Sequence, residues 1–163
     1  MEKQIENVLA ALMPQNALII RTALHTGLRI NDVLTLKTEQ IKPRFWVTEA
    51  KTGKKKAVGL PEALRLQILA QAGAVWAFPG RDPTKHKTRQ AIWYDVKRAA
   101  KAFRLPQNVA PHSFRKVYAV RLMEKYKSIT KVQKALNHQR SEITMIYALA
   151  DKLLEKAVDK PGQ

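Results

Sequence analysis

Four short segments of this chain contain side chains that could break a phosphodiester without a metal ion. A phosphodiester under attack gains negative charge on its non-bridging oxygens, and a planar guanidinium group can bind two such oxygens at once. The reaction also needs a nucleophile and a group that gives a proton to the leaving oxygen. The chain offers arginines, histidines, lysines and a tyrosine for these tasks.

Two of the segments place an arginine close to the start of an expected helix. Asp32 follows Arg29 by three residues in TGLRIND, so both share one helical face. His112 precedes Arg115 by three residues in PHSFR, at a helix N-terminus, which attracts phosphate. The alternatives are a surface arginine beside an acidic residue that complements the helix dipole, and a capping histidine beside an exposed arginine.

The other two segments supply a histidine, a tyrosine and a group of lysines. His138 lies in an expected turn, and Tyr147 follows nine residues later in an expected short helix. A loop histidine bonded to backbone and a packed tyrosine are the alternatives. Four lysines crowd an expected hairpin in AKTGKKK, where Lys51 is the candidate for chemistry. For the other three we favour a solvated turn or a nonspecific phosphate clamp, namely Lys54, Lys55 and Lys56.

The order and spacing of these segments resemble the tyrosine recombinases of the phage integrase family. Thr-Gly-Leu-Arg, Pro-His-Ser-Phe-Arg and Leu-Asn-His are close to the family's motifs, and a Lys-Thr-Gly hairpin is familiar in its phage branch. The resemblance covers residues 16–150. It implies a mostly α (α+β) catalytic domain with a small antiparallel β-sheet. It also implies cleavage and rejoining of DNA strands through a 3′-phosphotyrosyl bond.

The resemblance implies a role for each residue that would hold the phosphate. Arg29 and Arg115 would clamp the scissile phosphate, and His138 would help to stabilise the transition state. Asp32 would orient Arg29 without touching the phosphate itself. No carboxylate or Cys/His cluster has metal-ligand spacing, and the chain has no cysteine, so we expect neither a metal nor a cofactor.

The resemblance also implies which residues would move protons. Tyr147 would attack the phosphate, and His112 would accept or relay its proton. Lys51 would protonate the departing 5′ oxygen. Two other interpretations stay open: a relaxing enzyme like the type IB topoisomerases, and a non-enzymatic DNA-binding protein of the same fold.

The charge of the chain indicates a polyanionic partner. Thirty Lys and Arg against thirteen Asp and Glu give a net charge of +17, which favours double-stranded DNA over a membrane surface. No apolar run has the length of a membrane span, and no signal peptide is visible, so we expect a cytoplasmic protein. The candidate DNA-contacting residues are Lys54, Lys55, Lys56, Arg81, Lys85, Lys87, Arg89, Lys97, Arg98 and Lys101.

Apolar spacing and turn residues predict the elements that carry these side chains. We expect a helix that ends at Pro14, strands at 45–48, 57–60 and 75–78, and helices capped by Thr88 and Ser128. Further helices are expected at 17–25, 30–36, 61–71 and 112–126. The three tryptophans are expected to anchor the core, namely Trp46, Trp76 and Trp93.

We expect a single catalytic domain over residues 1–163, with a core at 16–150 and a tail helix at 151–163. Relatives in the resembled family usually carry an N-terminal helical DNA-binding domain, which we expect to be absent from this chain. In that family the segment after the tyrosine commonly docks onto a neighbouring protomer. The resemblance therefore implies a monomer when free and a homo-tetramer on DNA.

Overall fold

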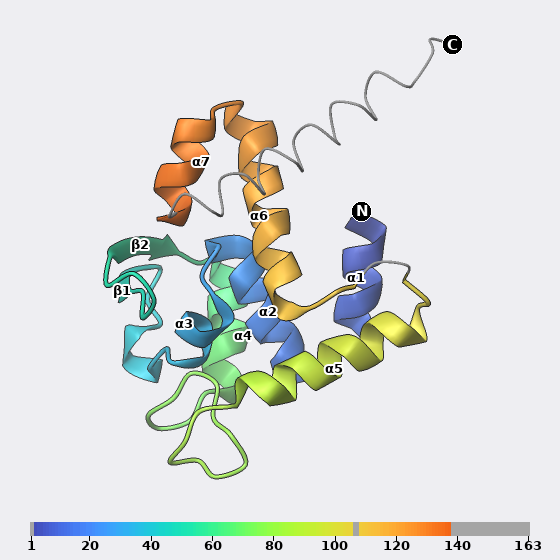
Figure 1. Ribbon diagram of the computed structural model, residues 1–163. Helices are drawn as coiled ribbons and strands as arrows, with labels where there is room; N and C mark the ends of the chain where they lie inside the picture. Colours follow the sequence, from blue (N-terminus) through green and yellow to red (C-terminus); the bar gives the residue numbers. More distant parts are fainter. Residues whose placement is uncertain (1, 106–107, 138–163) are drawn as a thin grey trace.

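The computed structural model describes residues 2–105 and 108–137 as a helical body beside one small sheet (Figure 1). His138, Tyr147 and the tail at 151–163 lie outside these residues, so the predictions made for them remain predictions. The elements are α1 (Glu2–Ala11), α2 (Pro14–Thr26), α3 (Ile30–Leu34), the 3-10 helix η1 (Thr38–Gln40), β1 (Arg44–Thr48), β2 (Lys55–Gly59), α4 (Glu62–Gln71), α5 (Arg89–Ala102), α6 (Pro111–Tyr126) and α7 (Ile129–Leu136).

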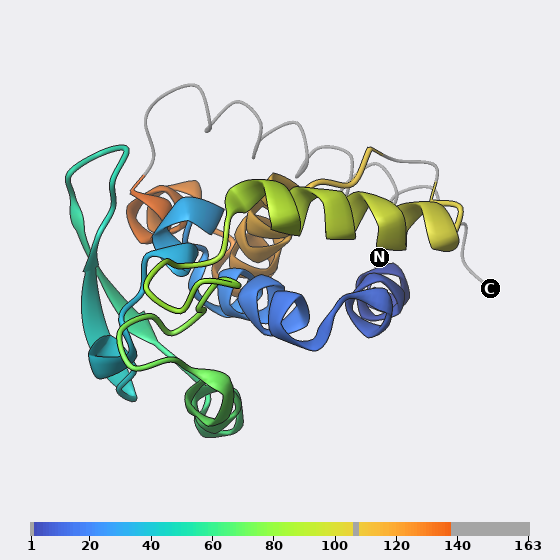
Figure 2. The ribbon, with the colours of Figure 1, turned by 90° about the horizontal axis from the view of Figure 1, so that it is seen from below.

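Helix α2 runs through the middle of the body, where α1, α3, α4 and α6 all contact it (Figures 1 and 2). Its residues Ile19, Ile20 and Ala23 are fully buried at helical spacing. The helix begins at Pro14, three residues earlier than predicted. Proline is well suited to the first turn of a helix, because the N–H that it lacks would have no partner there.

The predicted hairpin is present, and the pleat decides which of its side chains face the core. β1 and β2 are antiparallel, with Phe45 opposite Val58 and Val47 opposite Lys56. These four side chains are buried, whereas Trp46 between them is 65% exposed. Because side chains alternate across a strand, the sheet packs one face on the body and turns the other to solvent.

The predicted strand at 75–78 is wrong for the part of the chain that the structure describes. This segment forms only an isolated bridge, between Trp76 and Lys37. The backbone N–H of Thr38 donates to Val75 O, and that of Ala77 donates to Leu36 O. The ladder stops there because η1 begins at Thr38 and turns the backbone away.

Thr88 and Ser128 cap the N-termini of two helices, as predicted. Thr88 Oγ1 accepts a hydrogen bond from Ala91 N at 3.2 Å, and α5 follows. Ser128 Oγ accepts one from Lys131 N at 3.5 Å, and α7 follows. The backbone N–H groups of a helix's first turn have no carbonyl partner within the helix, and each of these side chains satisfies one of them. α6 begins at Pro111, so its first turn carries the PHSFR segment.

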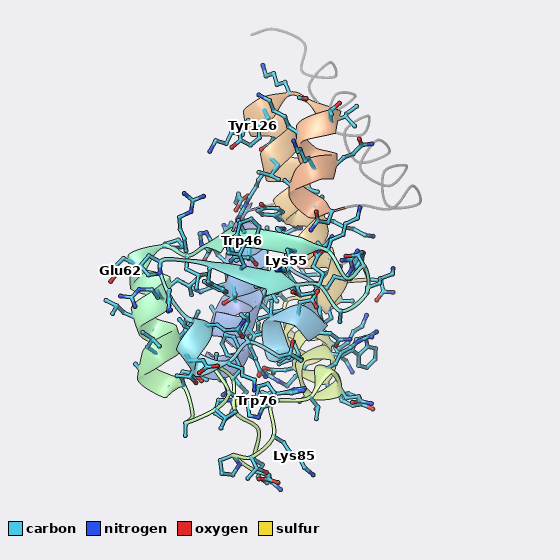
Figure 3. All side chains as sticks on the ribbon, turned by 90° about the vertical axis from the view of Figure 1, so that its left-hand side faces the viewer. Trp46, Lys55, Glu62, Trp76, Lys85 and Tyr126 are labelled. Atoms are coloured by element: carbon cyan, nitrogen blue, oxygen red, sulfur yellow. The ribbon has the colours of Figure 1, made fainter. Side chains whose placement is uncertain are left out.

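The prediction that the tryptophans anchor the core is wrong for at least two of them. Trp46 and Trp93 are exposed, by 65% and 43%. Trp76 is half-buried, and its indole Nε1 donates to Thr84 O in the loop that Figure 3 shows near Lys85. The core is built mostly from aliphatic side chains instead, with Phe78 as its largest fully buried member. None of the described helices has the length and apolar character needed to cross a membrane.

Candidate active site

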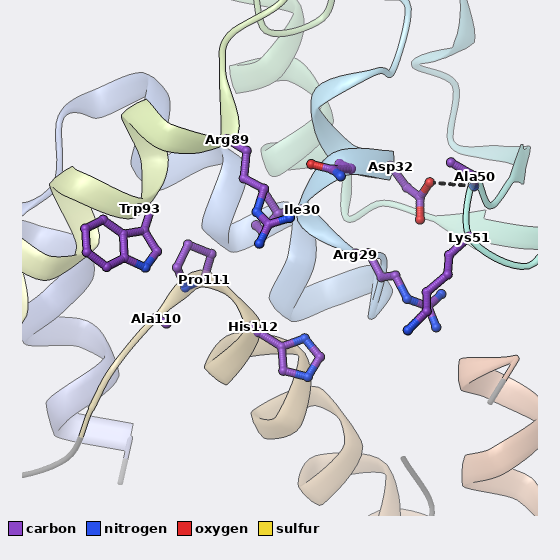
Figure 4. A pocket seen from close by; sticks show the side chains of 11 residues that line it. Arg29, Ile30, Asp32, Ala50, Lys51, Arg89, Trp93, Ala110, Pro111 and His112 are labelled. Carbon is purple, nitrogen blue, oxygen red and sulfur yellow. Dashed lines mark hydrogen bonds between the residues drawn. The ribbon is translucent and has the colours of Figure 1, made fainter. Parts of the chain in front are cut away.

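Four segments far apart in the sequence line one cleft of about 610 Å³ (Figure 4). Arg29 enters it from the residue before α3, Lys51 from the turn between β1 and β2, and His112 from the first turn of α6. Arg89 and Trp93 of α5 line it as well. The fold therefore brings together three of the six residues proposed for catalysis on one concave surface.

A buried carboxylate lies behind this cleft. Glu49, at the end of β1, has no exposed surface. Its Oε1 accepts a hydrogen bond from Arg29 Nη1 at 3.3 Å and lies 3.6 Å from Arg115 Nη1. Its Oε2 accepts hydrogen bonds from Thr52 Oγ1 at 3.2 Å and Asn137 Nδ2 at 3.1 Å. We call these five residues the Glu49 cluster.

The guanidinium of Arg115 also ties two backbone segments together. Arg115 is 3% exposed, so the alternative of an exposed arginine is wrong. Its Nη1 donates to Gly27 O at 2.5 Å, and its Nη2 donates to Leu136 O at 2.8 Å. The first bond fixes the turn that precedes Arg29, and the second fixes the C-terminal end of α7. Charge-assisted bonds of this kind make the group rigid before any ligand arrives.

The turn before Arg29 needs glycine for two reasons. Gly27 has a φ of 67°, in the left-handed region where a Cβ is unfavourable. A Cβ at this position would also lie inside van der Waals contact of the Tyr118 ring on α6. Tyr118 thus packs directly on the backbone of the turn, and this close approach positions the loop that carries Arg29.

Asp32 anchors the lysine hairpin to α3. Its Oδ1 accepts a hydrogen bond from Ala50 N at 2.9 Å, next to Lys51 (Figure 4). Burial raises the pKa of the Asp32 carboxyl above its ordinary value, and the nearby Glu49 adds to the rise, although the Ala50 N–H opposes it. A supporting role for Asp32 toward Arg29 was expected, and its contact with the hairpin was not.

Lys56 differs most from its prediction. It is only 9% exposed, so its placement in a solvated turn is wrong. Its Nζ lies 5.3 Å from the centre of the Tyr118 ring. Burial, together with the nearby positive charge of Arg115, lowers the pKa of its ammonium group to about 8. β2 begins at Lys55, two residues earlier than predicted, which puts Lys56 on the same inward face as Val58.

The other basic residues proposed to contact DNA fall into two groups. Lys87 Nζ donates to Gln15 Oε1 at 2.9 Å, Arg98 Nη2 donates to Ala11 O at 2.5 Å, and Lys97 donates to Asn108 Oδ1. These three therefore have partners within the protein. The remaining candidates are exposed, namely Lys54, Lys55, Arg81, Lys85, Arg89 and Lys101.

Fold and site together define the class of protein. A mostly helical domain with one antiparallel hairpin is the fold that this chain shares with the catalytic core of lambda integrase. The family model described as "Phage integrase family" matches residues 1–153. The chain belongs to this family, and the predicted fold class is confirmed.

Known proteins of this kind resemble the chain over nearly its whole length. The integrase of Escherichia phage P2 is 32% identical over 160 residues, which are 96% of this chain and 44% of that protein. The catalytic core of lambda integrase is 22% identical with a TM-score of 0.69, over 85% of this chain and 90% of that one. The XerH recombinase bound to its difH substrate is 23% identical with a TM-score of 0.72, over 97% and 51%. The chain thus spans about half the length of P2 integrase and XerH.

Proposed function

We propose that this chain is the catalytic domain of a site-specific DNA recombinase. It would cleave and rejoin double-stranded DNA without a metal ion, through a 3′-phosphotyrosyl bond at Tyr147. The observation that carries this proposal is the convergence of Arg29, Lys51 and His112 on one cleft backed by the Glu49 cluster. Family membership supports it, and so do the structures of similar recombinases in complex with DNA.

The arginines would hold the scissile phosphate. Arg29 lines the cleft, and its bond to Glu49 fixes the direction of its guanidinium. Arg115 is fixed behind it by two backbone carbonyls. Groups held in this way lose little freedom when the phosphate binds, and they stabilise the charge that develops in the transition state.

The remaining residues would break and form bonds. The Tyr147 hydroxyl oxygen attacks phosphorus as its proton passes to His112, and the bond from phosphorus to the 5′ oxygen breaks as Lys51 protonates that oxygen. His138 would contact the phosphate during this step. Attack by a 5′ hydroxyl of a second strand then reverses the step, so the bond energy is conserved. Lys51 and His112 are both exposed to the cleft, as proton transfer requires.

We further propose that residues 1–163 form one catalytic domain, monomeric when free and assembled as a homo-tetramer on DNA in the cytoplasm. The net charge of +17 supports binding to duplex DNA. The exposed basic residues around the cleft, such as Arg89 and Lys54, would contact the sugar–phosphate backbone. Two other recombinases of this fold have been solved on DNA, XerH on difH and lambda integrase on a core site.

A nucleophile assay tests the proposal. The protein is incubated in EDTA with a pool of random-sequence duplexes, each carrying a nick that traps the cleaved strand, and the DNA that becomes attached to protein is sequenced. We expect attachment by the wild type and none by Tyr147→Phe. Tyr126→Phe, on the exposed side of α6, is the matched control and should attach DNA normally.

The same assay separates the other interpretations. Attachment that persists in Tyr147→Phe, or that requires magnesium, would contradict the proposal. Relaxation of a supercoiled plasmid without exchange between two copies of the recovered site would identify a relaxing enzyme instead. Salt-dependent binding with no attachment under any condition would identify a DNA-binding protein that lacks the activity.

A further inference from the structure

The cleft has a polar end and an apolar end. Figure 4 shows Lys51 and Asp32 toward one end, and Trp93, Ala110 and Pro111 toward the other. The volume of about 610 Å³ falls within the roughly 300–1,000 Å³ of pockets that hold a whole organic ligand, so a phosphate alone would not fill the cleft. The apolar end therefore has room for a second group.

An indole ring lines this apolar end. Trp93, on α5, is 43% exposed, and it is held in place by two neighbours on the same helix. Lys97 Nζ lies over its ring at 5.4 Å from the centre, and Lys97 is itself bonded to Asn108. The ring of Tyr94 packs against it edge-on, with the two centres 5.2 Å apart. A single exposed tryptophan needs no explanation, but one held at the wall of a cleft offers a fixed aromatic surface to a ligand.

The adjoining phosphate site restricts what can occupy the apolar end. A DNA group that lies beside a bound phosphate is joined to that phosphate, so the candidates are a deoxyribose and a nucleobase. An aromatic side chain stacks on the face of any base, and a nearby cation holds the backbone, a task for which Arg89 between the two ends is suited (Figure 4). In a duplex the base faces are covered by neighbouring base pairs, so only a base that has left the stack fits.

We propose that Trp93 stacks on an unpaired nucleobase at the apolar end of the cleft, and that this base belongs to the nucleoside that keeps the scissile phosphate. The choice of nucleoside rests on the proposed function. Lys51, at the opposite end, would protonate the 5′ oxygen that departs, so the departing nucleoside lies on the Lys51 side. The nucleoside bonded through its 3′ oxygen then lies on the Trp93 side. Trp93 holds this cut end in place while the other strand is exchanged.

A mononucleotide tests the stacking without any cleavage. The full chain is titrated at pH 8 with 2′-deoxyadenosine 3′-monophosphate, and separately with its tetrahydrofuran analogue, which keeps the phosphate and lacks the base. Binding is followed by NMR of the ring protons of His112, which lines the same cleft. We expect the wild type to bind the nucleotide about tenfold more tightly than the analogue, as one base–aromatic stack provides.

Three variants separate stacking from a structural role. Trp93→Ala should bind the nucleotide about tenfold more weakly and bind the base-free analogue as the wild type does. Trp93→Phe keeps an aromatic ring and should lie between the two. Trp46→Ala is the matched control, because Trp46 is 65% exposed on the solvent face of β1, and it should bind both probes normally.

Two results of the titration would overturn the inference. The first is equal affinity of the wild type for the nucleotide and its base-free analogue. The second is a loss of affinity in Trp93→Ala that is equal for both probes, since a merely structural role would weaken both. If Trp93→Ala fails to fold, the two probes compared on the wild type and on Trp93→Phe still decide.

A double-mutant cycle on DNA tests which nucleoside is held. A nicked duplex of the site recovered from the attachment assay is made without the base directly 5′ of the cut, or without the base directly 3′ of it. Trp93→Ala should slow attachment at limiting DNA about tenfold on the intact duplex and on the duplex that lacks the 3′ base. It should cause no further loss where the 5′ base is missing. The opposite pattern would overturn the assignment of the nucleoside.

The titration and the proposed function can fail separately, because the titration needs neither cleavage nor Tyr147. DNA attachment at Tyr147, with no effect of Trp93 on nucleotide binding, would refute this inference alone. Nucleotide binding that depends on Trp93, with no DNA attachment under any condition, would refute the recombinase activity and leave a nucleotide site in the cleft.

Discussion

The interior and the rim of the candidate site are built in opposite ways. In the interior, Glu49 and Arg115 are almost fully buried. They form an ion pair with each other, and Arg115 also donates a hydrogen bond to Gly27 O. On the rim, Lys51 and His112 are exposed, one on a turn and one in the first turn of a helix. Groups that must be oriented beforehand lie inside, where their partners hold them, and groups that must exchange protons lie where a substrate can reach them.

This difference predicts that substitutions in the interior affect folding first, whereas substitutions on the rim affect chemistry first. The largest effect on stability is expected for Glu49→Ala. Removal of one partner from a buried ion pair leaves the other charge uncompensated, which costs about 3–5 kcal/mol. Here two arginines lose their common carboxylate.

The measurement for Glu49→Ala is urea unfolding followed by circular dichroism, with Glu39→Ala as the control. Glu39 is exposed on η1, so its removal should change the free energy of unfolding by less than about 0.5 kcal/mol. Equal midpoints for the two variants would show that the Glu49 cluster does not stabilise the fold.

The second effect concerns the turn that precedes Arg29. Gly27→Ala should destabilise the protein by about 2–3 kcal/mol, because it adds a Cβ at positive φ and displaces the Tyr118 ring. Gly53→Ala offers a matched comparison, since Gly53 has the same φ of 67° with no atom within 4 Å of its added Cβ. It should cost only about 1 kcal/mol. Similar losses for both variants would remove the steric role of Tyr118.

The third effect is the pH dependence that Lys56 contributes to stability. Its pKa is about 8 in the folded protein and 10.5 ordinarily, so the unfolded chain binds more protons between these values. Stability from this group therefore rises with pH from about 8 to 10.5, and the penalty is fully present below pH 8. The wild type should gain about 1–2 kcal/mol over this window relative to Lys56→Met. Parallel stability curves for the two proteins would contradict the lowered pKa.

The residues on the rim of the site could be predicted from the sequence better than those in its interior. Arg29, Lys51 and His112 stand in short motifs whose spacing could be read directly, and the structure brings all three to one cleft. Glu49 directly precedes the AKTGKKK segment, but nothing local shows that a glutamate after a strand will lose all contact with water. Its burial results from two arginines that approach from elements 20 and 66 residues away.

Two side chains face the opposite way from their predictions because of how side chains alternate along a strand. A shift of two residues in the start of β2 changed Lys56 from a turn residue to an inward strand residue, although the alternation with Val58 was available to show it. Trp46 is predicted to anchor the core, but it alternates with Phe45 and Val47 along β1 and so faces solvent. In both cases the strand period decided the outcome rather than the type of residue.

The smallest effect on folding, and the sharpest test of the comparison, is expected for Lys51→Ala. Lys51 is exposed on the hairpin turn, whose backbone is held by Gly53 N donating to Glu49 O at 2.8 Å and by Ala50 N donating to Asp32. Neither bond uses the lysine side chain, so unfolding in urea should change by less than about 0.5 kcal/mol. Strand cleavage should nevertheless slow by about 10²–10⁴-fold, the usual contribution of a general acid.

Lys54→Ala is the control on the same turn, and it should lower DNA affinity slightly without slowing cleavage at saturating DNA. A nicked duplex with a 5′-bridging sulfur at the cleaved bond makes the test specific, because a thiolate leaves without a proton. On that substrate Lys51→Ala should recover most of the wild-type rate if Lys51 is the acid. A defect of equal size on the oxygen and sulfur substrates would remove Lys51 from proton transfer. It would then place Lys51 with Arg29 among the residues that only bind the phosphate.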